Sequence, residues 1–195
     1  NTGLQFDKSS GKSNSLKCLS GVFDWNGGAR PNKLGDDVIT LGMASGLGSS
    51  CAVKIGSLCF TAPFSPKPLT LSECNKLKDT LGIKWCYYDP DYWVGAVKQC
   101  GHVSKMPTLA QLAELTSQMY IGNPSIGAKE DKNDIQFDPN SSVLKAFGVT
   151  YDLYLWSGEE YSALHSYYRH FNLNRSYWGN NYRNNSNYQA ICVGD

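Results

Sequence analysis

The chain has 195 residues, enough to bury a hydrophobic core in one domain with a large insertion or in two small domains. Charged residues make up 18% of it and the formal net charge is +1, which excludes a general electrostatic attraction to nucleic acid. No stretch reaches the roughly 18 apolar residues of a membrane helix, and no signal peptide is recognisable. The chain opens on Asn1 without a Met, as expected of a processed or trimmed product.

The N-terminal third of the sequence predicts a flexible start followed by short strands. Residues 1–20 are polar and rich in Ser and Lys, which is typical of a mobile lead-in. Residues 21–69 are rich in Gly and carry short apolar runs, so we expect a β-rich segment. The predicted strands lie at 38–41, 51–55 and 58–60.

Three helices are predicted between residues 70 and 120. Thr70 or Ser72 is a suitable N-cap for a helix over 72–81, which Gly82 would end. A second helix is expected over 90–100, because Pro90 and Gly101 are typical first and last signals. Beyond Pro107, a third helix carries an apolar stripe that predicts core packing. The stripe consists of Leu109, Leu112, Leu115 and Met119.

The C-terminal part predicts a loop at 121–150, a strand at 153–157 and a last strand at 190–193. The tract between these two strands has neither a helical nor an alternating pattern.

Seven cysteines are spread widely, at positions 18, 51, 59, 74, 86, 100 and 192. A zinc site would need close pairs such as C-x-x-C, and the chain has none. The spacing favours disulfides formed in an oxidising compartment, with one thiol left over. The alternative is a set of reduced core cysteines in a cytosolic protein.

Residues 172–188 have an unusual composition: 7 of the 17 are Asn, and Asn, Tyr, Ser and Arg together account for 14. Asn and Ser offer adaptable hydrogen bonds, while Tyr and Trp offer stiff contact area, as in antibody paratopes. The segment is therefore a candidate ligand-contact surface. An Asn-rich surface loop without a partner explains the composition about equally well.

The C-terminal half resembles a C-type lectin fold of the formylglycine-generating-enzyme type. The resemblance covers roughly residues 90–195 and rests on the motifs Leu155-Trp156-Ser157, Glu159-Glu160-Tyr161-Ser162-Ala163 and Ala190-Ile191-Cys192-Val193-Gly194-Asp195. It implies an α+β fold over residues 70–195 and a disulfide from Cys100 to the last strand at Cys192. We further predict the pairs Cys51–Cys59 and Cys74–Cys86, which leave Cys18 unpaired.

This group includes the variable proteins of diversity-generating retroelements, in which adenine mutation turns Asn codons into many others. Excess Asn before a fixed last strand resembles that signature and implies a variable segment of about 165–188, facing an unknown protein or glycan ligand. Trp178 and Ile191 are expected to pack inward, with Trp178 as a contact residue in the alternative, and Gly179 to lie at a tight turn. The residues predicted to form one contiguous exposed binding face are Tyr167, Tyr168, His170, Asn172, Asn174, Ser176, Tyr177, Asn180, Asn181, Tyr182, Asn184, Asn185, Asn187 and Tyr188.

The N-terminal part resembles bacterial type IV pilin-like proteins in the stretches Asp24-Trp25-Asn26-Gly27 and Pro31-Asn32-Lys33-Leu34-Gly35-Asp36-Asp37. This resemblance implies a bacterial, extracellular or cell-surface location and assembly into a pilus or pseudopilus through an apolar N-terminal helix, which this sequence lacks. Asp24, Asn26 and Asp37 could also bind Ca²⁺, although a turn closed by Asx side chains explains them better.

We expect no catalysis and no cofactor. The chain has three histidines and none of the common hydrolase motifs. Formylglycine-generating enzymes use a reactive cysteine pair near the C-terminal end, where this chain has Cys192 alone. The competing functions are a structural pilin-like subunit without a ligand and an enzyme on the same fold.

Overall fold

The computed structural model describes residues 6–8, 11–12 and 51–195. The chain divides into two units, 1–38 and 39–195. In the first, β1 (Phe6–Lys8) pairs antiparallel with β2 (Gly11–Lys12). The predicted strand at 38–41, the pilin-like stretches, the Ca²⁺ candidate Asp24, Asn26 and Asp37, and Cys18 lie outside the described residues.

The first predicted helix is present and is fixed by signals at both ends. Helix α3 spans Leu71–Leu81, and Thr70 rather than Ser72 is its N-cap. The Thr70 hydroxyl accepts a hydrogen bond from the Glu73 amide (3.1 Å), and the Glu73 carboxylate accepts one from the Thr70 amide (2.9 Å). This reciprocal pair is a capping box. Gly82 ends the helix at φ 75°, a left-handed conformation that favours glycine.

The next two predicted helices are also present, and each starts about two residues later than predicted. The third was predicted to run on to Tyr120 and ends at Ser117. Helix α4 (Tyr92–Cys100) begins after the cap Asp91 and ends at Gly101, and α5 (Leu109–Ser117) begins after the cap Thr108. A 3-10 turn, η2 (Val103–Lys105), lies between them. Helix α6 (Ser142–Ala146) was predicted as loop, because five residues are too few to show helical periodicity.

Two three-stranded antiparallel sheets complete the second unit, so the α+β class is confirmed. One contains β3 (Val53–Ile55), β4 (Leu58–Phe60) and β8 (Val193–Gly194) in the order β3-β4-β8. Strand β4 therefore pairs with the end of the chain, and residues 53–60 lie in the same unit as the predicted 70–195 domain.

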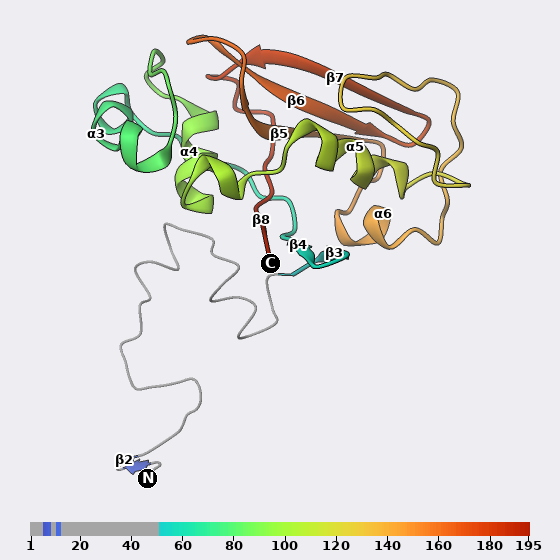
Figure 1. Ribbon diagram of the computed structural model, residues 1–195, viewed down its shortest axis with the longest axis horizontal. Helices are drawn as coiled ribbons and strands as arrows, with labels where there is room; N and C mark the ends of the chain where they lie inside the picture. The colour runs from blue at the N-terminus through green and yellow to red at the C-terminus, as the bar shows by residue number, and fades with distance from the viewer. Residues whose placement is uncertain (1–5, 9–10, 13–50) are drawn as a thin grey trace. The chain divides into compact units, whose positions relative to one another are not determined.

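The second sheet has the order β5-β6-β7 (Figure 1) and contains the Asn-rich segment as far as Tyr182. It consists of β5 (Asp152–Glu160), β6 (His165–Asn172) and β7 (Arg175–Tyr182). Strands β6 and β7 form a regular hairpin from His165↔Tyr182 to Asn172↔Arg175. The prediction of a tract without strand pattern was wrong, because polar and aromatic side chains occur on both faces and hide the period of two.

Helix α5 lies across one face of this sheet, which we call the helix face (Figure 1). Its predicted stripe is buried as expected, with Leu112, Leu115 and Met119 fully inaccessible to solvent. These side chains join Leu155 and Phe171 of the sheet in one core cluster. A second cluster joins α3 and α4 to Trp156 and the segment around Tyr188. The helix face of the sheet is thus sealed at the end that α5 covers.

Three disulfides connect the elements, Cys51–Cys59, Cys74–Cys86 and Cys100–Cys192, and all three predicted pairings are confirmed. Cys100–Cys192 joins the end of α4 to the residue before β8, across 92 positions of sequence. None of the helices among residues 51–195 is long and apolar enough to cross a bilayer.

Candidate ligand-binding surface

Strand alternation divides the predicted binding residues between the two faces of the sheet. Residues directly opposite each other in a pair share a face, and neighbours along a strand alternate. Tyr167, Ser176, Asn180 and Tyr182 therefore share the helix face with Leu155 and Phe171. The opposite face carries Tyr168, His170, Asn172, Tyr177 and Asn181. The expectation of one contiguous binding face was wrong.

Burial separates the predicted residues further. His170, Asn172, Ser176 and Tyr188 are buried, so the prediction that the set is mostly exposed is wrong for these four. Asn174, Tyr182, Asn184 and Asn187 are exposed. The remaining six are half-buried: Tyr167, Tyr168, Tyr177, Asn180, Asn181 and Asn185. Ile191 and Cys192 are buried as expected, whereas Trp178 is half-buried rather than packed inward.

Some of the polar side chains are buried because they hold the hairpin in place. The Ser176 hydroxyl accepts a hydrogen bond from Nε of Arg169 (2.9 Å) and donates one to the hydroxyl of Thr116 on α5 (3.0 Å). Arg169 also donates to the carbonyls of Ala128 and Glu130, and so holds that loop over the sheet. Burial lowers the pKa of Arg169 to about 10, still far above neutral pH. These side chains have a structural role.

Aromatic stacking and an Asp–His pair occupy the opposite face. The ring of Tyr154 lies between those of His170 and Tyr188, with centroid distances of 4.2 and 4.8 Å. Nε2 of His170 lies 2.6 Å from Oδ1 of Asp152. The same oxygen accepts a hydrogen bond from the side-chain amide of Asn172 (2.6 Å). No Ser, Thr or Cys among residues 51–195 hydrogen-bonds to His170, so no nucleophile–base pair is assembled there.

Burial sets the ionisation of this pair. It lowers the pKa of His170, although the hydrogen bond to Asp152 works against the shift. Partial burial raises the pKa of Asp152, but the hydrogen bonds with Asn172 and His170 outweigh it and hold that pKa below its ordinary value. A neutral His170 beside a charged Asp152 is therefore the state expected at neutral pH.

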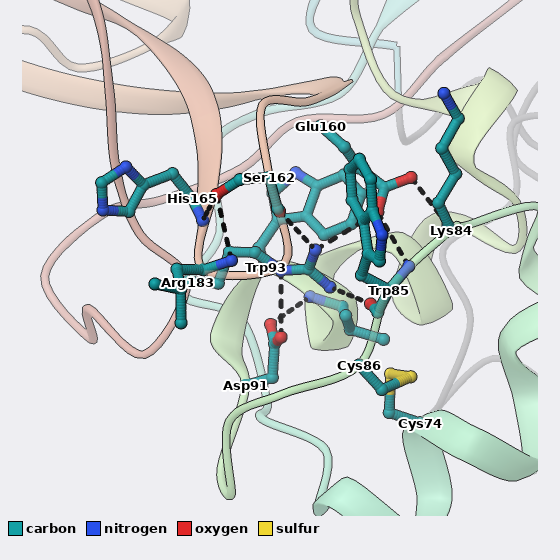
Figure 2. A network of polar contacts seen from close by, with 12 residues as sticks. Cys74, Lys84, Trp85, Cys86, Asp91, Trp93, Glu160, Ser162, His165 and Arg183 are labelled. Carbon is teal, nitrogen blue, oxygen red and sulfur yellow. Dashed lines mark hydrogen bonds and ion pairs between the residues drawn. A yellow bond between two sulfur atoms is a disulfide. The ribbon is translucent and has the colours of Figure 1, made fainter.

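Arg183, directly after β7, lies at the centre of a buried polar network (Figure 2). Its Nε donates to Oδ2 of Asp91 (3.1 Å) and its Nη1 to Oε1 of Glu160 (3.2 Å). Its Nη2 donates to the carbonyl of Trp85 (2.7 Å). The guanidinium carbon lies 4.6 Å from the centroid of the Trp93 ring, in a cation–π contact. One side chain thus connects β5, β7, α4 and the loop before α4.

The two carboxylates of this network are bound from other sides as well. Asp91 accepts a hydrogen bond from the Val94 amide (2.8 Å) and so caps α4. Burial raises the pKa of Asp91, and the charge of Arg183 opposes that shift. Glu160 accepts hydrogen bonds from the amides of Lys84 (2.8 Å) and Trp85 (3.3 Å). Together with Cys74–Cys86, these contacts fix the loop at residues 84–88 against the sheet (Figure 2).

Seven rings form a continuous row of neighbours, which we call the aromatic band. The row runs over the part of the helix face beyond Arg169 and onto the loop at residues 84–88. Ring centroids lie 4.4 Å apart for His165–Tyr182, 5.4 Å for Tyr161–Tyr167, 6.0 Å for Tyr161–His165 and 6.1 Å for Tyr167–Trp178. Tyr88 links the loop to the sheet, 6.5 Å from Tyr182 and 5.0 Å from Tyr87. The band consists of Tyr87, Tyr88, Tyr161, His165, Tyr167, Trp178 and Tyr182.

The aromatic band is open to solvent. Tyr87, Tyr161 and Tyr182 are 57, 53 and 52% exposed, and the other four residues of the band are half-buried. Lys129 lies over its far end, with Nζ 4.8 Å from the Tyr167 ring and 5.6 Å from the Trp178 ring. Large exposed aromatic clusters on a fixed scaffold are typical of binding surfaces.

The sequence indicated only part of the band. Tyr167 and Tyr182 were predicted as binding residues, and Trp178 was the stated alternative contact. Tyr87, Tyr88 and Tyr161 lie outside the Asn-rich tract, so its composition gave no signal for them. The structural roles of Arg169 and Arg183 were also missed, because their partners are up to 98 positions away in the sequence.

Gly179 was predicted to lie at a tight turn, but it lies within β7, opposite Tyr168. A Cβ atom at this position would lie 2.9 Å from the hydroxyl oxygen of Tyr168. The missing side chain therefore makes room for a ring from the neighbouring strand.

No group of three or more His, Cys, Asp or Glu side chains within the described part of the chain is arranged to hold a metal ion. Comparison with models of protein families, with curated proteins and with solved structures finds no match to this chain.

Proposed function

We propose that this chain is a ligand-binding recognition protein, displayed outside the cell, and that the aromatic band is its contact surface. The observation that carries the proposal is the continuous run of seven partly exposed rings on a rigid scaffold. Rigid aromatic side chains provide contact area at low entropic cost, and such anchors dominate binding energies at protein surfaces.

The scaffold beneath the band supports this function. The Arg183 network, the disulfide Cys74–Cys86 and the β6–β7 hairpin fix the backbone on both sides of the band. A surface that does not need to rearrange loses little free energy on binding.

The three disulfides are compatible with an extracellular compartment, because such bonds form and persist under oxidising conditions. We further propose that the Asn-rich segment is diversified, and that bacterial surface display follows from the pilin-like resemblance of residues 24–37. A template copy of the segment beside a reverse-transcriptase gene is the genomic observation that tests diversification.

Binding is tested with two probe sets, a glycan array and random-sequence peptides displayed on phage. Hits obtained with the wild-type protein are measured again with the double variant Tyr167→Ser/Tyr182→Ser. We expect its affinity to fall at least about tenfold, a typical loss for truncated anchor residues. The matched control is Tyr151→Ser, because Tyr151 is as exposed as Tyr87 but makes no ring contact with the band.

All three proteins should unfold at similar temperatures, because the substituted side chains are at least partly open to solvent. Hits that bind the double variant as well as the wild type would place the contact surface elsewhere. The absence of any hit from either probe set would favour a structural subunit without a ligand.

A further inference from the structure

Strand β7 forms one border of the three-stranded sheet (Figure 1). Successive residues of a strand direct their backbone N–H and C=O groups to alternate sides. Ser176 directs its groups outward, because its amide and carbonyl both pair with Lys132, each at 2.9 Å. The Trp178 amide also points outward, to Oδ1 of Asp131 (3.0 Å). By the same alternation, Asn180 and Tyr182 direct their backbone groups away from the sheet.

Part of this outer edge is already satisfied. The Tyr182 amide donates to its neighbour's side chain, Asn181 Oδ1 (2.7 Å), and the Tyr182 carbonyl accepts from the Asn185 amide (3.0 Å). Three groups remain without a hydrogen bond to any residue in 51–195: the carbonyl of Trp178 and both the amide and the carbonyl of Asn180. Unpaired groups of this kind are a template for another strand.

The residues that usually prevent such pairing are missing from this stretch. Edge strands are commonly protected by Lys, Pro or a bulge, and β7 contains none of these between Ser176 and Tyr182. The open groups also lie next to the aromatic band, since Trp178 and Tyr182 flank Asn180 in the sequence and share its face of the sheet.

We propose that β7 receives an extended polypeptide segment of a protein partner, which pairs with the amide and carbonyl of Asn180 and with the carbonyl of Trp178. The proposal rests on the proposed function and names its ligand class. An amide and a carbonyl on one residue match the backbone of another strand. The chain's own Lys132 shows that this edge accepts such a partner, because it pairs antiparallel with Ser176.

The geometry also predicts which contacts with the partner contribute affinity and which contribute selectivity. Backbone pairing with Asn180 does not depend on the partner's sequence. Every second side chain of the added strand would face the rings of Trp178 and Tyr182, because side chains alternate between faces. Changes in the exposed side chains of the band would then alter selectivity and leave the backbone contact in place.

The test compares Asn180→Pro with Asn180→Ala, using peptides selected from a random-sequence phage library on the wild-type protein. Proline removes the outward N–H and is tolerated in an edge strand, whereas alanine removes only the side chain. Both variants lose the side chain of Asn180, and only proline also loses the N–H, so we expect Asn180→Pro to bind at least about tenfold more weakly than Asn180→Ala. Unfolding temperature and disulfide mapping establish that both variants fold.

A measurement on the wild type keeps the test decisive if Asn180→Pro does not fold. Amide hydrogen exchange at Asn180 should slow at least about tenfold when a selected peptide is bound, because its N–H becomes hydrogen-bonded. Unchanged exchange, equal binding by the proline and alanine variants, or a library that yields no peptide would each overturn the proposal. If the double variant Tyr167→Ser/Tyr182→Ser still binds glycans or peptides more weakly than the wild type, the proposed function stands without strand pairing at β7.

Discussion

Arg183 shows how a polar segment can have a fixed backbone. Its side chain is fully buried, and its guanidinium is bound by two carboxylates, two carbonyls and an aromatic face. Its own amide and carbonyl also pair, with Leu164 (2.9 Å) and Tyr92 (2.8 Å). A residue in an Asn-rich tract is therefore part of the buried structure.

Removing this guanidinium should destabilise the fold strongly. Arg183→Leu leaves Asp91 and Glu160 without their cationic partner, and the removal of one partner from a buried ion pair costs about 3–5 kcal/mol. Urea unfolding measures the change in the free energy of unfolding.

Arg175→Leu is the matched control for this prediction. The Arg175 side chain makes a ring contact with Tyr177 but no hydrogen bond within residues 51–195, so we expect a change within about 1 kcal/mol. Neutralising both carboxylates, in Arg183→Leu/Asp91→Asn/Glu160→Gln, should recover part of the lost stability. Equal destabilisation by the two arginine variants would contradict the role given to Arg183.

His170 should make the fold sensitive to acid. Burial lowers its pKa, so the folded protein binds fewer protons here than the unfolded chain once the pH falls below the ordinary histidine value of 6.5. Stability is then complete above pH 6.5 and decreases as the pH falls through the folded pKa. Asp152 acts in the same direction at lower pH, because its pKa is held below 3.8.

The measurement is the unfolding temperature between pH 7 and pH 5. The wild type should lose stability over this range, and His170→Gln should lose less, since a glutamine amide can donate to Asp152 without titrating. The other groups facing His170 are Asp152, Arg175, Tyr154 and Tyr177. The pKa of Asp152 is held below 3.8 and burial raises that of Tyr154 above 10, so neither titrates between pH 5 and 7. An equally steep loss in both proteins would assign the acid sensitivity to other groups.

At the scale of elements, the β6–β7 hairpin is held by contacts that are distant in sequence. The Tyr120 hydroxyl, at the end of the α5 segment, donates to the carbonyls of Asn172 and Arg175 at 2.5 and 2.7 Å. The Ser157 hydroxyl of β5 donates to the Tyr167 carbonyl (2.9 Å). Such hydrogen bonds fix the register of the hairpin, because its own side-chain pattern specifies that register only weakly.

The disulfide Cys100–Cys192 should contribute most of the three to stability. In the chain-entropy model, its 92-residue separation corresponds to about 4–5 kcal/mol, compared with about 2.5 kcal/mol for the 8-residue separation of Cys51–Cys59. Replacing each pair by alanines and measuring the free energy of unfolding tests the order. A larger loss from Cys51/Cys59 would show that local packing decides.

At the scale of the whole molecule, the two faces of the β5-β6-β7 sheet have different roles. One carries the aromatic band beyond α5, and the other carries the stack of Tyr154, His170 and Tyr188. Diversification is compatible only with open positions, because volume changes in a packed core cost several kcal/mol.

This predicts a pattern of variation among copies of the gene. Substitutions should accumulate at Asn174, Tyr182, Asn184 and Asn187, which are exposed. Buried positions of the same tract should stay fixed: Asn172, Ser176, Arg183 and Tyr188. Sequencing the locus from many isolates tests this, and equal variation at both sets would contradict it.

The sequence by itself determined that helices α3, α4 and α5 exist, with starts one or two residues from those observed, but it gave no signal for α6. Caps such as Thr70, Asp91 and Thr108 act within three residues of sequence, and the left-handed Gly82 and Gly101 follow from local backbone sterics. The Cys100–Cys192 pair was implied by resemblance and is present. Local signals of this kind are readable because their energies arise between near neighbours in the chain.

Only the tertiary structure decided which residues of the Asn-rich tract reach solvent. Asn172 and Asn174 are two positions apart, yet the first is buried against Asp152 and the second is exposed at the hairpin turn. Tyr87 and Tyr182 belong to one band although 95 positions separate them in the sequence. Burial and contact of this kind depend on which elements pack against each other, and residue type alone does not carry that information.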